Sequence, residues 1–108
     1  MSTTMENNLN ISMNLRAVEN IKGEILSEVA RLYQSLADYD EVGVYEHVSG
    51  SIATIIAMDY ILARRLGISY SSIDDKIVSL VTMAEENGHE LETAFSDMSE
   101  LRKYIRSR

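Results

Sequence analysis

The absence of proline is the feature that most restricts what this chain can fold into. A chain of 108 residues with no proline and only 5 glycines is poor in the two residues that most often end helices and build the turns of β folds. Hydrophobic residues make up 45% of the chain and charged residues 25%, which is typical of a globular protein. Long helices are therefore the first expectation.

A first amphipathic helix is predicted from Leu15 to Leu36, because apolar residues recur there at steps of three and four. The helix should end between Asp38 and Gly43, where helix-weakening residues gather. Residues 1–13 lack this periodicity and are expected to form a mobile tail. The remaining residues, 14–108, are expected to form a single helical domain.

A second helix, predicted over about 44–66, is apolar around most of its circumference. Residues 52–63, IATIIAMDYILA, are interrupted only by Thr54 and Asp59. Small residues recur near this segment and favour close approach of another helix, which would also compensate for a glycine inside the helix: Ser49, Gly50, Ala53 and Ala57. Gly67 is expected to cap its end. A helix of this kind needs neighbours on more than one side, so we expect a homodimer that completes a helical bundle.

A third helix is predicted to begin at Ser71 or Ser72, each of which is followed three residues later by an aspartate, and to end at Asn87 and Gly88. Its buried side is expected to carry Ile73, Ile77, Leu80, Val81 and Ala84. A short last helix should start at Asp97. Since no segment alternates like a strand, the predicted fold is all-α, with three main helices and a short C-terminal one.

The net charge of −7 argues against DNA or RNA as a partner. The basic end of the chain is interpreted as cations that complement the dipole of the last helix: Arg102, Lys103, Arg106 and Arg108. No apolar stretch is long enough to span a membrane, and the N-terminus does not resemble a signal peptide. These observations, with the absence of cysteine, predict a cytoplasmic protein without a membrane partner.

The phrases LSEVARLY and DYILARRLGIS, the latter followed by SSIDDKI, resemble the helices of the MazG-like, all-α nucleoside triphosphate pyrophosphohydrolases. The resemblance covers roughly residues 20–85. It implies a MazG-like helical bundle. It also implies a magnesium site, because active members of that family carry Glu-x-x-Glu on one helix and Glu-x-x-Asp on the next.

Placed on this chain, the first motif of that family falls on Glu28 and Arg31, and the second falls on Ser51 and Thr54. Three of the four implied carboxylates are therefore replaced. Because a divalent cation that bridges a triphosphate needs several oxygen ligands, the site is expected to be degenerate. We assign no catalytic residue from the sequence.

One carboxylate pair remains, since Glu24 and Glu28 lie one turn apart on the same helix. Two interpretations of this pair stay open. The pair forms a single-cation site, with Mg as the cofactor of any activity and Lys76 meeting a phosphate, as the resemblance implies. Alternatively, both are solvated charges, and Arg31 pairs with them.

The other polar residues that we considered are the two histidines and one aspartate. His47 and His89 are distant in sequence and lack the spacing of a zinc hydrolase. His89 and its neighbouring glutamates are interpreted as a solvated connection, with a metal cluster as the alternative. Asp59, in the apolar centre of the second helix, should lie at the rim of the buried zone or be paired, with a catalytic base as the alternative.

The hypothesis that these observations favour is a non-catalytic module that binds a nucleotide or another protein. The first alternative is an active, Mg-dependent nucleoside triphosphate pyrophosphohydrolase with a rearranged site. The second alternative is a helical module that binds only other proteins.

Overall fold

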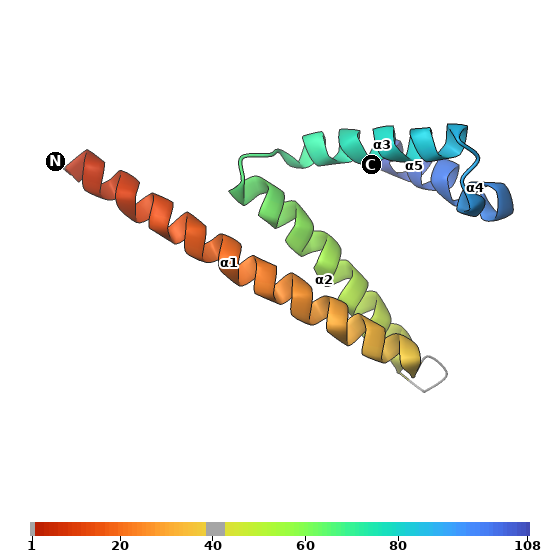
Figure 1. The fold of residues 1–108 in the computed structure, drawn as a ribbon, viewed down its shortest axis with the longest axis horizontal. Coiled ribbons are helices and arrows are strands. Elements are labelled where there is room, and N and C mark those ends of the chain that lie inside the picture. The colour runs from red at the N-terminus through yellow and green to blue at the C-terminus, as the bar shows by residue number, and fades with distance from the viewer. Residues whose placement is uncertain (1, 39–42) are drawn as a thin grey trace. The chain divides into compact units, whose positions relative to one another are not determined.

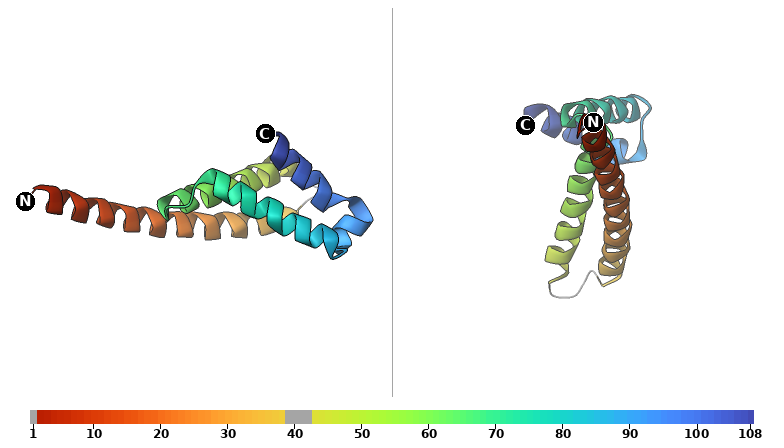
Figure 2. Two further views of the ribbon diagram at one scale, coloured as in Figure 1. Left: turned by 90° about the horizontal axis from the view of Figure 1, so that it is seen from above. Right: turned by 90° about the vertical axis from the view of Figure 1, so that its left-hand side faces the viewer.

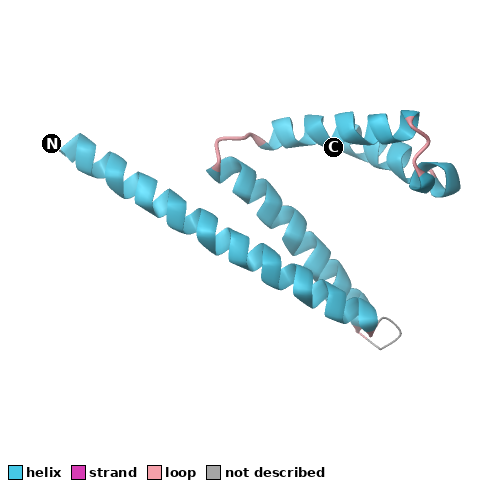
Figure 3. Ribbon diagram, in the orientation of Figure 1, coloured by secondary structure: helices cyan, strands magenta, loops and turns pink. Residues whose placement is uncertain are grey.

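The computed structural model describes residues 2–38 and 43–108, and within these ranges every regular element is a helix, which confirms the all-α prediction (Figures 1 and 3). The helices are α1 (Ser2–Ala37), α2 (Val44–Arg65), α3 (Tyr70–Glu86), α4 (Glu90–Phe95) and α5 (Asp97–Ser107). Part of the predicted turn between the first two helices, residues 39–42, lies outside the described residues.

The chain divides into two compact units, Met1–Gly67 and Ile68–Arg108, whereas the sequence was interpreted as one domain after the tail. The first unit consists of α1 and α2. The second consists of α3, α4 and α5. Each unit is described by itself below.

Helix α1 begins at Ser2, so the sequence prediction that the helix starts near Leu15 was wrong. Residues 4–13 are all exposed and pack against no other helix of the first unit, which agrees with the lack of apolar periodicity in their sequence. Backbone hydrogen bonding propagates a helix one residue at a time, and no proline interrupts it here. The mobility of this segment stays a prediction.

Helices α1 and α2 form an antiparallel hairpin, as the views in Figures 1 and 2 show. The open end of the hairpin is closed by a hydrogen bond from Asn14 Nδ2 to the carbonyl oxygen of Arg65, 3.0 Å long. Residues 2–13 of α1 extend beyond this point and past the end of α2 (Figure 1). Gly67 follows α2 with φ +85° and its N–H bonds the carbonyl of Arg64, so the predicted glycine cap is confirmed.

Less exposed residues repeat at alternating steps of three and four along both helices of this hairpin, which is the spacing of two helices packed along one seam. The seam contains Asn14, Val18, Ile21, Ile25, Glu28, Leu32 and Ser35 from α1, and Val44, Val48, Ser51, Ile55, Met58 and Leu62 from α2. The seam therefore carries polar groups at several positions as well as apolar ones. Two of these polar groups, Glu28 and Ser51, belong to the motif positions identified from the sequence.

In the second unit, α3 packs against α5 through Val78, Val81 and Ile105, all of which are buried. Leu80, which was predicted to be buried, is 54% exposed, because the buried residues Val78 and Val81 of α3 lie about 100–160° around the helix from it. The cap of α3 also differs from the prediction. Ser69 is the N-cap, and its Oγ accepts a hydrogen bond from the N–H of Ser72 at 3.1 Å.

Ion pairs hold both ends of the α3–α5 contact. The guanidinium of Arg102 donates two hydrogen bonds to the carboxylate of Glu85, at 3.0 and 3.1 Å, and Arg108 pairs with Asp74 at 2.8 Å. The bond to Glu85 raises the pKa of Arg102 above its ordinary value. These two C-terminal cations therefore join helices, which the interpretation of the basic end as a dipole complement did not anticipate.

The short helix α4 was not predicted, and it is joined to α5 by the carboxylate of Glu92. This carboxylate accepts hydrogen bonds from Ser99 N at 2.8 Å and from Ser99 Oγ at 2.9 Å. The backbone hydrogen bond from Ser99 holds the pKa of Glu92 below its usual range. Glu92 therefore satisfies a donor in the first turn of α5, as a capping side chain does.

Candidate functional site

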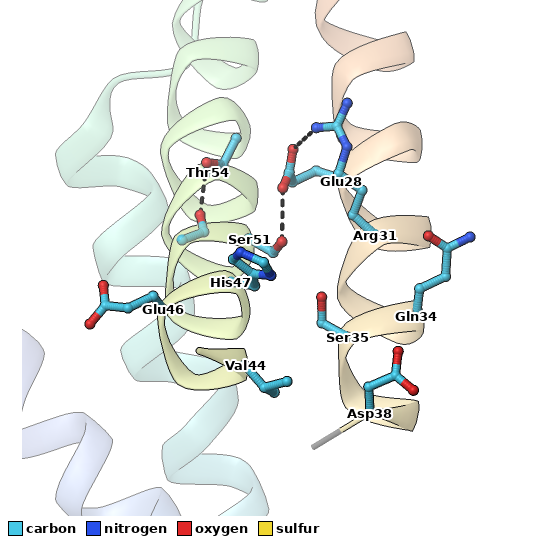
Figure 4. A pocket seen from close by; sticks show the side chains of 11 residues that line it. Glu28, Arg31, Gln34, Ser35, Asp38, Val44, Glu46, His47, Ser51 and Thr54 are labelled. Carbon is cyan, nitrogen blue, oxygen red and sulfur yellow. Dashed lines mark hydrogen bonds and ion pairs between the residues drawn. The ribbon is translucent and has the colours of Figure 1, made fainter. Parts of the chain in front are cut away.

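The carboxylate of Glu28 is the centre of the candidate site, and both of its oxygens already have partners (Figure 4). Oε1 accepts a hydrogen bond of 2.8 Å from Ser51 Oγ, which crosses from α2 to α1. Oε2 accepts a hydrogen bond of 2.7 Å from Arg31 Nη1, one turn further along α1. The side chain of Glu28 is only 13% exposed, whereas that of Arg31 is 67% exposed. We call these three residues the Glu28 network.

The local sequence explains why the network forms. Glu28 and Ser51 both occupy positions of the α1–α2 seam, so the antiparallel pairing brings them face to face. Arg31 follows Glu28 by three residues and therefore lies on the same side of α1. The sequence analysis assigned Glu28, Arg31 and Ser51 to motif positions. It did not predict the hydrogen bond between Glu28 and Ser51.

The fourth motif position, Thr54, lies one turn beyond Ser51 and does not contact the Glu28 carboxylate through a hydrogen bond. Its Oγ1 instead donates to the carbonyl oxygen of Gly50 in its own helix, at 2.8 Å. Glu24 is exposed on α1. Glu24 and Glu28 thus lie on the same helix, as the sequence predicted, and both line one hollow, but Glu28 lies at the seam whereas Glu24 is exposed.

Two adjoining hollows lie on this side of the hairpin and share Glu28, Arg31 and Thr54. The larger has a volume of about 710 Å³, and it reaches toward the turn between the helices (Figure 4). Its other lining residues are Gln34, Ser35, Asp38, Val44, Glu46, His47, Gly50 and Ser51. The smaller hollow is additionally lined by Asn20, Gly23, Glu24 and Ser27. We call the two hollows together the polar groove.

Most of the groove residues were not singled out from the sequence. Gln34, Asp38 and Glu46 belong to no motif, and only the three-dimensional pairing of the helices brings them together. His47 was considered as an isolated histidine, and the structure places it in this groove. Carboxylates outnumber cationic side chains along the groove, so it favours no anion by charge alone.

The other candidate residues lie elsewhere. Lys76 is exposed on α3, in the second unit, whereas the groove lies in the first. His89 is the N-cap of α4, where its Nδ1 accepts a hydrogen bond from Leu91 N at 3.1 Å, so it has a structural role. Asp59 is exposed on α2, so it does not require the partner that a buried carboxylate would need.

The residues of the groove do not fit a magnesium cage. In residues 2–38 and 43–108 no group of three or more His, Cys, Asp or Glu side chains is arranged to hold a metal ion. Glu28 uses both oxygens on Ser51 and Arg31, and the guanidinium already neutralises its charge. A divalent cation that entered here would have to displace Arg31 and would gain a single part-buried carboxylate.

None of the described helices is long and apolar enough to cross a lipid bilayer. Comparison with curated proteins found no match, and comparison with solved structures found none either. A family model described as the MazG-like family matches residues 11–98, which includes the whole α1–α2 seam from Asn14 to Leu62 and the Glu28 network. The motif positions on α1 and α2 therefore lie inside the matched region. This chain belongs to the MazG-like family.

Proposed function

We propose that this protein is a non-catalytic member of the MazG-like family that acts as an interaction module and does not hydrolyse nucleoside triphosphates. One observation carries the proposal. The only motif carboxylate that the chain retains, Glu28, is neutralised by Arg31 and hydrogen-bonded by Ser51 within the protein itself.

The four motif positions of this chain differ from the family pattern in their total charge. Hydrolysis of a polyphosphate depends on cations that neutralise the charge developing on its oxygens, and in this family the implied source is magnesium held by four carboxylates. Here the four motif positions carry one carboxylate, one guanidinium and two hydroxyls. Their formal charge is zero instead of −4, so the electrostatic attraction for a divalent ion is largely gone.

Nucleotide binding without hydrolysis is a second candidate function, and the larger hollow of the polar groove favours it. The hollow of about 710 Å³ is in the size range of small-molecule sites. Arg31, Gln34 and His47 line it and could donate hydrogen bonds to a base or a phosphate. The acidic neighbours Asp38 and Glu46 weaken this candidate.

The test is a screen of the common ribonucleoside and deoxyribonucleoside triphosphates with Mg²⁺ or Mn²⁺, with release of pyrophosphate as the readout. We expect no release above buffer, and we expect Glu28→Gln to behave like the natural sequence. Release that requires a divalent ion and disappears in Glu28→Gln would refute the proposal and support the rearranged-enzyme alternative.

A variant that restores the missing carboxylates tests the same charge argument by asking whether metal binding returns. The triple substitution Arg31→Glu, Ser51→Glu, Thr54→Asp rebuilds the family's four-carboxylate pattern. In EDTA the variant should melt at a lower temperature than the natural protein, because like charges meet at the seam, and Mn²⁺ should raise that temperature. The unchanged protein should show no shift with Mn²⁺. Equal shifts in both would contradict the charge argument.

A further inference from the structure

The turn between α3 and α4 contains the dipeptide Asn87-Gly88, the only place in the chain where a glycine follows an asparagine. The backbone nitrogen that follows an asparagine is positioned to attack the carboxamide carbon of that side chain. Glycine favours this reaction because it has no Cβ to hinder the approach and adopts many backbone conformations. The other asparagines are each followed by Asn, Leu or Ile: Asn7, Asn8, Asn10, Asn14 and Asn20.

A Schellman motif closes the C-terminal end of α3 at this turn. Gly88 has φ +68°, and its N–H donates to the carbonyl oxygen of Glu85 at 3.2 Å. The N–H of His89 donates to the carbonyl oxygen of Ala84 at 2.9 Å. The bond of Gly88 is at the long end of the range for such hydrogen bonds. The nitrogen that would attack Asn87 is therefore held by one long hydrogen bond.

The atoms that would react are open to water. Asn87, Gly88 and His89 are all exposed. Among the residues that the structure describes, the side-chain amide of Asn87 has no hydrogen-bond partner. A Cβ built at Gly88 would meet no atom within 4 Å. Rearrangement of this turn therefore displaces no packed side chain at the glycine.

Helix α4, which follows the turn, is held weakly enough for the turn to open. None of the 6 residues Glu90–Phe95 is buried, and Leu91 and Phe95 are 42% and 69% exposed. Segments with few buried contacts open at a small fraction of the free energy of global unfolding. Once the turn opens, rotation about the ψ angle of Asn87, 3° in the closed turn, and about its χ1 angle brings the Gly88 nitrogen to the carboxamide carbon.

We propose that Asn87 is a site of spontaneous modification, where the side chain loses ammonia and the main chain isomerises to isoaspartate, and that this change unfastens the α3–α4 turn. The Gly88 nitrogen bonds to Cγ of Asn87, and the side-chain nitrogen leaves as ammonia with the proton that the Gly88 nitrogen gives up. Water then opens the resulting succinimide ring. Cleavage between the nitrogen and Cγ gives aspartate, and cleavage between the nitrogen and the main-chain carbonyl carbon gives isoaspartate. The sequence consumes one water, releases one ammonia, and oxidises or reduces nothing.

Isoaspartate disturbs the turn in two ways. It places the Cβ of residue 87 in the main chain, which becomes one carbon longer there, so Gly88 and His89 no longer reach the two α3 carbonyls together. The new carboxylate also lies at the negative end of the α3 dipole, beside Glu85 and Glu86. Both effects favour the open turn.

The first experiment follows the reaction in the full chain over days, at neutral pH and physiological temperature. Trypsin cleaves after Lys76 and Arg102 and releases residues 77–102, in which Asn87 is the only amide side chain. This peptide should gain about 1 Da, since NH is replaced by O, about tenfold faster than the peptide that carries Asn20, which lies within α1.

Asn87→Gln is the matched control, because glutamine would have to form a less favourable six-membered ring, and the mass gain should be lost. The same chain in concentrated urea gives the reaction of an open turn. Conversion in urea without conversion of the folded chain would show that the Schellman motif protects Asn87, and would overturn the proposal. Equal rates at Asn20 and Asn87 in the folded chain would also overturn it.

A second experiment measures what the modification does to the turn. The converted chain is separated by ion exchange, since it carries an extra negative charge, and an endoproteinase that cleaves before aspartate but not isoaspartate identifies the isomer. In the isoaspartate form, exchange of the His89 N–H with deuterium should accelerate by about tenfold or more. Asn87→Asp adds the charge without lengthening the main chain and should accelerate this exchange less. An unchanged rate in the isoaspartate form, or equal rates in the two forms, would overturn the proposed opening.

Discussion

Replacing Ser51 by alanine removes the hydroxyl that donates to Glu28 Oε1 at 2.8 Å across the α1–α2 seam. Ser51 is 5% exposed and the Glu28 side chain is 13% exposed, so water replaces the lost bond poorly. A hydrogen bond to a charged group contributes about 1.5–3 kcal/mol. The better helix propensity of alanine offsets about 0.5 kcal/mol of this. We therefore expect Ser51→Ala to lower the free energy of unfolding by about 1.5 kcal/mol.

Arg31→Ala removes the other partner of Glu28 and should destabilise the protein less. The Arg31 side chain is 67% exposed, so its ion pair with Glu28 at 2.7 Å is screened by water and contributes about 0.5 kcal/mol. Ser51→Ala should consequently destabilise the protein more than Arg31→Ala, although the serine is neutral and the arginine is charged.

The assay is urea unfolding followed by far-ultraviolet circular dichroism, at one fixed protein concentration for all variants. A double-mutant cycle of Ser51→Ala with Glu28→Ala isolates the coupling between the two side chains, which should be about 1 kcal/mol. Ser27→Ala is the control for helix propensity and should be neutral or slightly stabilising. A coupling below about 0.3 kcal/mol, or a larger loss for Arg31→Ala than for Ser51→Ala, would refute the reasoning.

Three further predictions concern other positions. Gly50→Ala should raise the free energy of unfolding by about 0.5–1 kcal/mol, measured by urea unfolding, because no atom lies within 4 Å of the added Cβ; destabilisation would show that another surface packs there. Ser69→Ala should cost about 1 kcal/mol through loss of the cap to Ser72 N, and an unchanged melting temperature would contradict this role. Because Ser99 lowers the pKa of Glu92, the carboxylate stabilises the fold above the unfolded value of about 4.3, and this stabilisation is lost as the pH falls through the lower folded pKa. The amide signal of Ser99 in NMR should therefore titrate below pH 4.3 or so, and a midpoint above that value would count against the hydrogen bond.

The positions of the candidate site could be located from the sequence, but the hydrogen bond that joins its two helices could not be predicted. The family resemblance identified the positions Glu28, Arg31, Ser51 and Thr54. Pairing of Arg31 with the carboxylates belonged to one of two open interpretations, and the structure contains the Arg31–Glu28 pair. The bond between Ser51 and Glu28 joins residues 23 positions apart. Its existence depends on the axial register of two helices, which the sequence of neither helix determines alone.

The helices themselves were determined by local chemistry. Intrahelical hydrogen bonds join residues four apart, and the caps at Gly67 and Asn87 act within a few residues, so the absence of proline and the glycine positions were sufficient to predict α2 and α3, whereas the short α4 was not predicted. The exact start of α3 was less accessible, since Ser69 competes with nearby serines that cap almost equally well.

The tertiary structure alone decided which side of each helix became the inside. Leu15 and Leu36 belong to the apolar stripe predicted for α1, yet Leu15 is 62% exposed, while the polar Glu28 faces the seam. Each helix of the hairpin carries more apolar residues than one seam can cover, and the face that packs is the one for which the total packing and hydrogen-bonding free energy of the pair is lowest. The packed face depends on both helices together. The periodicity of either sequence therefore predicts a helix but does not predict which of its faces packs against the other helix.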